Sequence, residues 1–253
     1  MKSDALLPAK IATAGWGIPR EHANEQQVGT GLQKYASVWS ATEINSTFYR
    51  RHRSSTFERW RESVPESFLF AVKMPRSITH EAALASPRPA LEEFFLELRP
   101  LSAKLGPVLV QLPASVQFEV RRAGAFFRAL RSLYKGPVAC EPRHASWYTE
   151  RASSVLLAND VARVVADPPR PEAASLPGGA TSLRYVRWHG SPNIYRSSYS
   201  DERLAWLVDF VIAQPSGTNT WCVFDNTASG AAFTDALRFR DLLRRKLSER
   251  DPR

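Results

Sequence analysis

The sequence predicts a single α/β domain of the (β/α)8 TIM-type barrel class, covering residues 1–253, in which a loop replaces the sixth helix. Short apolar runs of strand character alternate with amphipathic helical stripes along the whole chain. The alternation repeats about eight times, at roughly 30 residues per unit, which is the rhythm of such a barrel. A chain of 253 residues is also an ordinary length for one barrel domain. A doubly wound open sheet is the competing fold, but its glycine-rich first turn is poorly matched by residues 15–19, GWGIP.

Eight apolar segments are expected to form the parallel strands, and each ends at a polar residue or a turn. A Pro, Gly and Ala-rich stretch at 168–182 follows the sixth strand, so we expect a loop there. In chain order the expected strands cover residues 11–14, 41–48, 68–73, 107–111, 138–141, 162–167, 183–189 and 220–225.

Apolar residues at i, i+3, i+4 and i+7 predict a helix after most of the strands. Ser55 and Glu58 have the spacing of a capping box at the start of the second helix. Pro100 is expected to kink or divide the third. The last helix is expected to be basic, because it carries Arg238, Arg240, Arg244 and Arg245.

Composition places the chain among ordinary globular proteins, with 43% hydrophobic and 23% charged residues. Cys140 and Cys222 lie in apolar runs without metal-ligand spacing, so we expect both to be buried as small hydrophobic residues. The chain shows neither a secretory signal nor a run of about 18 apolar residues. These features predict a cytoplasmic protein that does not associate with membranes.

The formal net charge of +9 leaves nucleic acid open as a partner. Much of the excess is arginine, in one cluster at residues 50–53 and in the last helix. The sequence shows no zinc finger, RNP-type aromatic motif or helix-turn-helix pattern. A solvated basic face is therefore favoured over a nucleic-acid interface.

Functional side chains of such barrels lie at the carboxyl ends of the strands, and here these ends are polar. Because side chains alternate along a strand, Glu43 and Asn45 should share a face, as should Arg187 and His189. Charged groups that point into a barrel cost several kcal/mol unless they are paired. Their convergence therefore predicts a site at the barrel mouth, and a lattice of salt bridges that fills the mouth is the structural alternative.

Motifs at these strand ends resemble those of the YecE-like family, the domain of unknown function 72 (DUF 72). The resemblance implies a (β/α)8 barrel with a site at its mouth, and it implies no reaction. Pro142 departs from the bulky apolar residue expected there, and Asp225-Asn226 replaces paired asparagines, so charge at the eighth strand need not be a family-wide feature. The matching stretches are GW (15–16), EINSTFY (43–49), FAVKMP (70–75), ITH (78–80), LGP (105–107), QLP (111–113), EPRHASW (141–147), RWHG (187–190), YS (199–200), DNT (225–227) and GAA (230–232).

The first functional hypothesis is a metal-independent enzyme that acts on a small anionic molecule, such as a phosphorylated or carboxylated sugar-like compound. Guanidinium and ammonium groups of Lys73, Arg143 and Arg187 would hold the anion. Glu43 or Glu141 would transfer protons together with His189. The other candidate substrate-binding residues are Trp16, Asn45, Tyr49, Gln111, His144, Trp147, Tyr199 and Asn226.

Two further hypotheses belong to other classes. Glu141, Asp167, His189 and Asp225 end four strands in succession and could hold Mg²⁺, Mn²⁺ or Zn²⁺ in an isomerase or a phosphodiesterase or endonuclease. The neighbouring arginines would repel such an ion, so neither a metal nor another cofactor is predicted. The third hypothesis is a non-enzymatic protein that binds nucleic acid through its arginines.

Overall fold

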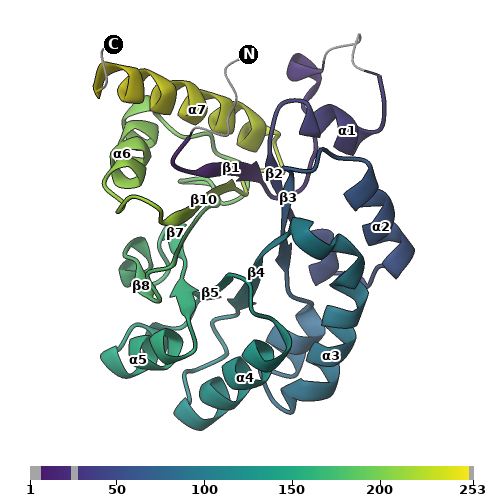
Figure 1. The fold of residues 1–253 in the computed structure, drawn as a ribbon. Helices are drawn as coiled ribbons and strands as arrows, with labels where there is room; N and C mark the ends of the chain where they lie inside the picture. Colours follow the sequence, from purple (N-terminus) through teal and green to yellow (C-terminus); the bar gives the residue numbers. More distant parts are fainter. Residues whose placement is uncertain (1–6, 24–27, 251–253) are drawn as a thin grey trace.

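The computed structural model describes residues 7–23 and 28–250 and is an α/β fold with parallel sheets. Figure 1 shows the helices on the outer side of the strands. The strands are β1 Lys10–Thr13, β2 Ala41–Ile44, β3 Leu69–Lys73, β4 Leu105–Leu112, β5 Val138–Pro142, β6 Val161–Arg163, β7 Val165–Asp167, β8 Gly178–Gly179, β9 Leu183–Trp188 and β10 Asn219–Phe224. The α-helices are α1 Gly31–Ala36, α2 Ser54–Glu62, α3 Pro87–Leu98, α4 Val120–Leu133, α5 Glu150–Ala158, α6 Asp201–Ile212 and α7 Ala231–Arg250.

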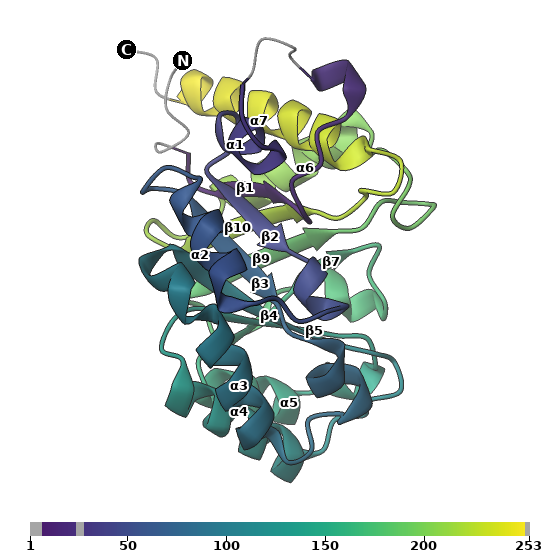
Figure 2. The ribbon, with the colours of Figure 1, turned by 90° about the vertical axis from the view of Figure 1, so that its right-hand side faces the viewer.

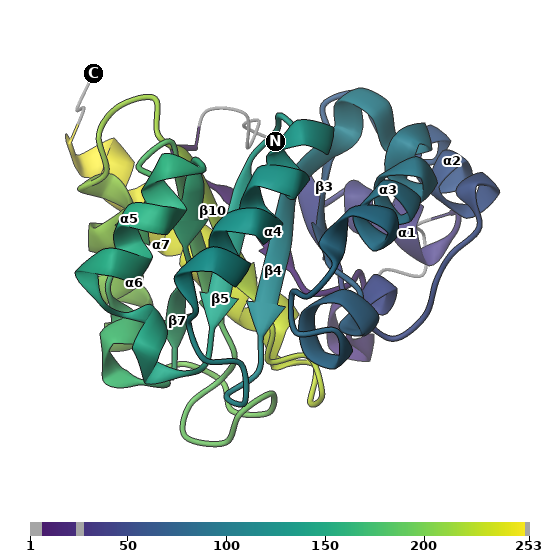
Figure 3. The same ribbon diagram turned by 90° about the horizontal axis from the view of Figure 1, so that it is seen from below.

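The strands form two hydrogen-bonded sheets, ordered β1-β10-β9-β7 and β2-β3-β4-β5-β6-β8, rather than the one continuous barrel sheet that the sequence predicts. All strand pairs are parallel except β6 with β8. The predicted sixth strand is divided at Val164, so β6 pairs with β5 and β7 pairs with β9. A single bridge between Ala14 and Glu43 connects β1 to β2. Figure 3 shows β4 and β5 side by side within the second sheet.

The second strand ends earlier than predicted. β2 stops at Ile44, and a 3-10 helix at Ser46–Phe48 follows it. Asn45 has helical backbone angles, so the prediction that Asn45 continues the face of Glu43 is wrong. The hydroxyl of Thr47 donates hydrogen bonds to the carbonyls of Ile44 and Lys73, which favours a turn over further strand.

The connection after β7 contains a 3-10 helix, Glu172–Ser175, and the short β8 in place of an α-helix, which confirms the predicted loop. α3 ends at Leu98, and a short 3-10 segment, Arg99–Lys104, follows it with Pro100 as its second residue, as expected for a helix divided by proline. The predicted capping box of α2 is not formed, because this helix begins at Ser54 and its N-cap, Arg53, makes no side-chain capping bond.

Apolar residues form two layers, one between strands and helices and one on the inner side of the strands. Figure 2 shows the strands between α1, α6 and α7 at one end of the view and α3, α4 and α5 at the other. Cys140 and Cys222 are fully buried, as predicted. Within the described residues, no helix is both long enough and apolar enough to cross a membrane. The inner layer includes Ala12, Ala41, Ala71, Leu109, Ala139, Tyr185 and Trp221.

Candidate active site

A layer of charged side chains lies next to the inner apolar layer, at the carboxyl ends of the strands. Glu43 follows the inner residue Ala41 by two positions on β2, and Glu141 follows Ala139 in the same way on β5. Residues two apart on a strand face the same side. The alternation that buries the alanines therefore also turns the carboxylates inward.

Arg187 of β9 joins the carboxylates of both sheets. Its guanidinium contacts Glu43 through Nη2 at 2.8 Å and through Nε at 3.0 Å. Nη1 donates to Glu141 Oε2 at 3.2 Å, and Nη2 lies 3.0 Å from Asp225 Oδ2. The side chain is 0% exposed, so these pairs are formed away from water.

His189 lies between two of these carboxylates. Its Nε2 is 2.9 Å from Glu141 Oε1, and its Nδ1 is 2.9 Å from Asp225 Oδ2. A neutral imidazole can donate to only one of them, whereas an imidazolium can donate to both. Arg143 Nη2 also lies 2.5 Å from Glu141 Oε1. The ring therefore stands in a hydrogen-bonded chain in which proton transfer between His189 and Glu141 requires no rearrangement.

Opposite charges keep the buried carboxylates ionised. Burial alone would raise the pKa of Glu141, but Arg143, His189 and Arg187 outweigh it and hold that pKa well below its usual value. Burial likewise opposes ionisation of Asp225, and Arg187 and His189 lower its pKa overall. The same pairs raise the pKa of Arg187 against its own burial, so the network is held in its charged form.

Lys73 of β3 stands apart from this pairing. Its side chain is buried, with 6% of the residue exposed, and Nζ lies 4.0 Å from the centre of the Phe48 ring. In residues 7–23 and 28–250, Nζ forms neither a hydrogen bond nor an ion pair. Burial and then the charge of Arg187 lower its pKa to about 8, against the opposing effect of the carboxylates.

Two tyrosines that the sequence analysis did not single out also contact the charged layer. Tyr185 donates its hydroxyl hydrogen to Glu43 Oε2 at 2.8 Å. Strand alternation could have identified it, since it lies two residues before Arg187. The ring of Tyr195 packs edge-on against His189 at 5.8 Å, and its backbone N–H donates to the carbonyl of His189. Tyr195 lies in the long loop after β9, where no periodic pattern indicates its position.

The structure brings Glu43, Lys73, Glu141, Arg143, Arg187 and His189 into one cluster, but several aromatic candidates have other surroundings. Trp147 is 1% exposed and donates from Nε1 to the carbonyl of Val116, so it packs in the core instead of lining a pocket. Trp16 packs edge-on against Trp60 of α2. Tyr49 is 75% exposed. Aromatic residues near strand ends occur on either side of a strand, and the sequence pattern did not distinguish the two.

Three other predicted binding residues have structural partners. His144 accepts a hydrogen bond from the backbone of Ser146 and caps the short helix Ala145–Trp147. The hydroxyl of Tyr199 links the backbones of Gly190 and Asp167. Asn226 is fully buried and donates to Asp235 at 2.7 Å. These bonds fix the loops around the cluster, and the predicted contact of His144 and Tyr199 with a substrate has no support in the geometry. Asn226 differs, because its buried Oδ1 accepts no hydrogen bond from the described residues.

Gln111 and Asn45 remain candidates for contact with a ligand. Gln111 is the register partner of Glu141 in the neighbouring strand. Its buried Oε1, like Oδ1 of Asn45, accepts no hydrogen bond from the described part of the chain. A buried acceptor without a donor is costly, and a bound molecule could supply the donor.

The residues of the alternative metal site do not all meet. The carboxylate of Asp167 pairs with Arg203, whereas those of Glu141 and Asp225 contact Arg187 and His189. Arg187 contacts both Glu141 and Asp225 and so occupies the space between them. Among the described residues, no group of three or more His, Cys, Asp and Glu side chains is arranged to hold a metal ion.

Comparison with known proteins relates the chain to proteins of unassigned activity. The sequence model of the family described as "Protein of unknown function DUF72" matches residues 10–253. The UPF0759 protein YecE of Escherichia coli K12 is 34% identical over 119 residues, which cover 46% of this chain and 43% of that protein. The UPF0759 protein YunF of Bacillus subtilis is 26% identical over a match that covers 96% of this chain and 97% of that protein.

Solved structures of the same family share the fold. A DUF72 family protein from Thermotoga maritima superposes with a TM-score of 0.79 at 26% identity, covering 93% of this chain and 99% of that one. A second, from Enterococcus faecalis, has a TM-score of 0.76 at 21% identity, covering 93% and 95%.

Proposed function

The chain belongs to the DUF72 family of proteins of unknown function, and from that premise we propose that it is an enzyme that acts on a small anionic molecule by general acid/base chemistry. The observation that carries the proposal is the hydrogen-bonded pair of Glu141 and His189, with Arg143 beside it. A general acid or base must come within about 2.6–3.2 Å of the proton that it transfers, and His189 and Glu141 meet this condition for the proton between them. A partly exposed cation next to it can hold an anionic group of the substrate.

Each member of the cluster has a distinct role in this proposal. His189 and Glu141 exchange the proton, and Asp225 orients the imidazole through Nδ1. Arg143 holds the anion. Its side chain is 15% exposed, and its buried Nε donates to no acceptor among the described residues. Lys73 contacts the substrate beside it.

Arg187 has a different part from the one that the sequence suggested. Its guanidinium is 0% exposed and contacts Glu43, Glu141 and Asp225. A side chain with these partners has no access to a ligand. Its effect on catalysis is to fix the carboxylates and keep them ionised.

We also infer that the two sheets act as one closed barrel around this cluster. Gly15 N donates to the carbonyl of Glu43 at 2.8 Å across the seam between β1 and β2. At the other seam, Val164 N donates to Cys140 O at 2.9 Å, so the divided sixth strand touches both sheets. The ion pairs of Arg187 with Glu43 and Glu141 bridge the interior between the sheets.

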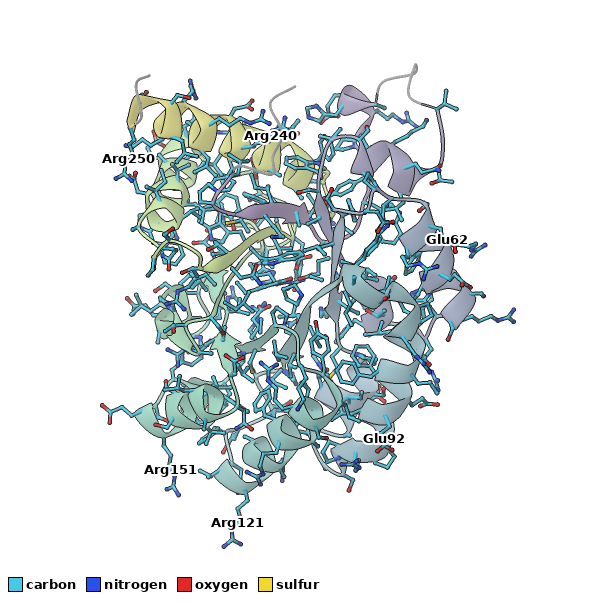
Figure 4. All side chains as sticks on the ribbon, in the orientation of Figure 1. Glu62, Glu92, Arg121, Arg151, Arg240 and Arg250 are labelled. Atoms are coloured by element: carbon cyan, nitrogen blue, oxygen red, sulfur yellow. The ribbon has the colours of Figure 1, made fainter. Side chains whose placement is uncertain are left out.

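The basic surface favours nucleic acid less than the net charge suggests. Arg51 pairs with Glu93 and Glu97, and Arg238 pairs with Asp201 and Asp235. The outward-pointing arginines are spread over several helices, as Arg121 on α4 and Arg151 on α5 show in Figure 4. A scattered arrangement with local acidic partners does not make the continuous basic track that a phosphate backbone needs.

Thermal unfolding with added anions tests the proposal. Sulfate or phosphate should raise the melting temperature in a dose-dependent way, because an anion that binds the folded state stabilises it. Arg143→Ala should abolish the effect, whereas Arg245→Ala in the basic helix should retain it. Stabilisation by Mn²⁺ or Zn²⁺ that is lost in Glu141→Gln would instead support a metal enzyme. An anion effect that survives Arg143→Ala would contradict the assignment of this site.

A further inference from the structure

Lys73 and Lys104 are both buried, but their ammonium groups have different surroundings. Lys104 is 4% exposed, and its ammonium donates to the carbonyls of Arg61 and Val64 at 2.8 and 2.9 Å. Its Nζ also lies 3.4 Å from Glu66. Lys73 is buried to nearly the same degree, yet within the described chain its Nζ has only the face of Phe48 beside it. The fold therefore supplies acceptors for one buried ammonium and leaves the other amine available.

The groups around Lys73 favour an amine that loses its proton near neutral pH. Burial and Arg187 lower its pKa to about 8, while Glu43, Asp225 and Glu141 oppose the shift. The charge of Lys73 also acts on His80, whose own pKa is lowered by burial and then by Lys73 and Arg76. With a pKa of about 8, roughly a tenth of the amine is neutral at pH 7, compared with less than one part in a thousand for an ordinary lysine.

We propose that Lys73 Nζ is a nucleophile that forms an imine with a carbonyl carbon of the substrate, so that the substrate is a small anionic aldehyde or ketone. This inference rests on the proposed function and assigns its substrate class. Three features of the geometry carry it: the amine is buried, it has no acceptor among the described side chains, and it lies in the same charged layer as the Glu141–His189 pair. A lysine in such a setting is suited to imine chemistry.

The step balances without an oxidant or a reductant. The lone pair of the neutral amine attacks the carbonyl carbon, the C–N bond forms, and the C=O π electrons move to oxygen. A proton passes from nitrogen to that oxygen and gives a carbinolamine. A second proton from the acid/base pair lets the hydroxyl leave as water while the nitrogen lone pair forms the C=N bond. The resulting iminium ion can withdraw electrons from the adjacent carbon, and Arg143 holds the anionic group.

Reductive trapping tests the proposal on the full chain. The protein is incubated at pH 7.5 with glyoxylate, an anionic aldehyde, and cyanoborohydride, and each of its seven lysines is followed by peptide mass spectrometry. Lys73 should be labelled at least about tenfold faster than exposed Lys135, because far more of its amine is neutral at that pH. The labelling rate at Lys73 should rise with pH around a midpoint near 8. Lys73→Arg, checked for an unchanged circular dichroism spectrum, should lose only that product.

Labelling with a neutral aldehyde distinguishes the imine proposal from the proposed function. Arg143→Ala should slow labelling of Lys73 by glyoxylate about tenfold or more and leave labelling by glycolaldehyde unchanged. If Lys73 reacts no faster than Lys135 while sulfate still stabilises the protein through Arg143, the imine proposal is overturned and the proposed function stands. If both aldehydes label Lys73 equally and sulfate has no effect, Lys73 is the nucleophile but the substrate is not anionic.

Discussion

At the scale of single residues, the cost of burying Lys73 is a sign of function. A lysine whose pKa falls from 10.5 to about 8 destabilises the folded state at neutral pH, because burial disfavours its charged form. Proteins retain such groups where activity requires them and replace them elsewhere. Lys104, buried with acceptors around its ammonium, provides the matched comparison within the same chain.

Replacing Lys73 by methionine should therefore stabilise the protein. At pH 7 we expect the free energy of unfolding to rise by about 3–4 kcal/mol, which is the lowering of the pKa from 10.5 to about 8 converted at about 1.4 kcal/mol per unit. Between about pH 8 and 10.5 the Lys73 amine binds its proton more strongly in the unfolded chain than in the folded one. The free energy of unfolding of the wild type therefore rises with pH in this window. The advantage of Lys73→Met should shrink across that window, as measured by urea unfolding at pH 7, 8.5 and 10.

Lys104→Met is the control and should have the opposite sign. The change leaves the carbonyls of Arg61 and Val64 without their donor, and each buried unsatisfied group costs about 1–3 kcal/mol. The free energy of unfolding is expected to fall by about 2–4 kcal/mol in the same urea experiment. If both variants lose stability equally, Lys73 is an ordinary packed lysine.

The charged residues of the cluster could be predicted from sequence, and most of the aromatic ones could not. Strand alternation places Glu43, Glu141 and Arg187 on the inner face because the residues two positions before them are small or apolar. No comparable rule orients Trp147, which lies in a 3-10 turn after the strand and turns toward Val116. Turn geometry, which the apolar pattern does not encode, decides its direction.

At the scale of elements, α7 holds the loops around the cluster through one buried carboxylate. Asp235 is fully buried and accepts hydrogen bonds from the hydroxyl of Ser198 at 2.5 Å and the backbone N–H of Tyr199 at 3.0 Å. It also accepts from the side chains of Asn226 at 2.7 Å and Arg238 at 3.0 Å. The N-terminal part of α7 thereby ties the end of the loop after β9 to the segment after β10.

Asp235→Ala should loosen this connection. Removing the carboxylate leaves several buried donors unsatisfied, so we expect a loss of about 3–5 kcal/mol in urea unfolding. Hydrogen exchange at the amide of Tyr199 should accelerate, since that N–H loses its acceptor. Asp241→Ala, later on the same helix with a 62% exposed side chain, should change neither quantity measurably. Unchanged exchange at Tyr199 in Asp235→Ala would show that the loop is held by other contacts.

Element types were more predictable than their limits. The loop in place of the sixth helix followed from the prolines and glycines of residues 168–182. The early end of β2 did not follow, because Thr47 belongs to a residue type that favours strands and only its hydroxyl bonds to two carbonyls turn the chain.

At the scale of the whole molecule, the parallel α/β architecture followed from the alternation of strand and helix patterns, while the division into two sheets did not. The break at Val164 directly follows Arg163 in a run that is otherwise apolar, and a single charged residue does not mark the end of a strand. The sequence likewise does not indicate which side chains connect the two sheets in the interior. Arg187 of one sheet contacts Glu43 and Glu141 of the other, and the sequence indicates charge at these positions without stating which groups pair.

Arg187→Met tests whether this link holds the two sheets together. Without the guanidinium, Glu43 keeps only its bond from Tyr185, and Asp225 keeps His189. We expect the free energy of unfolding to fall by about 3–5 kcal/mol at pH 7, which is the usual cost of leaving a buried charge without its partner. Arg184→Met, on the same strand with a partner in Gln214, should lose far less.

The stability of the wild type and that of Arg187→Met should respond to a falling pH with opposite signs. In the wild type the folded pKa values of Glu141 and Asp225 lie below their usual values, so their contribution is fully present above about pH 4 and lost as the pH falls further. In Arg187→Met, burial without the guanidinium should raise the pKa of Glu141 and Asp225, which Arg187 helps to lower in the wild type. The folded variant then binds protons more strongly than the unfolded chain, and its stability should rise as the pH falls from 7 to 5. Urea unfolding at about pH 4 and 3 measures the fall in the wild type, and at pH 7, 6 and 5 it measures the rise in the variant. The measurement at pH 5 remains accessible if the variant unfolds at pH 7. A variant whose stability is flat over this range, like the wild type, would show that Arg187 does not keep the carboxylates ionised.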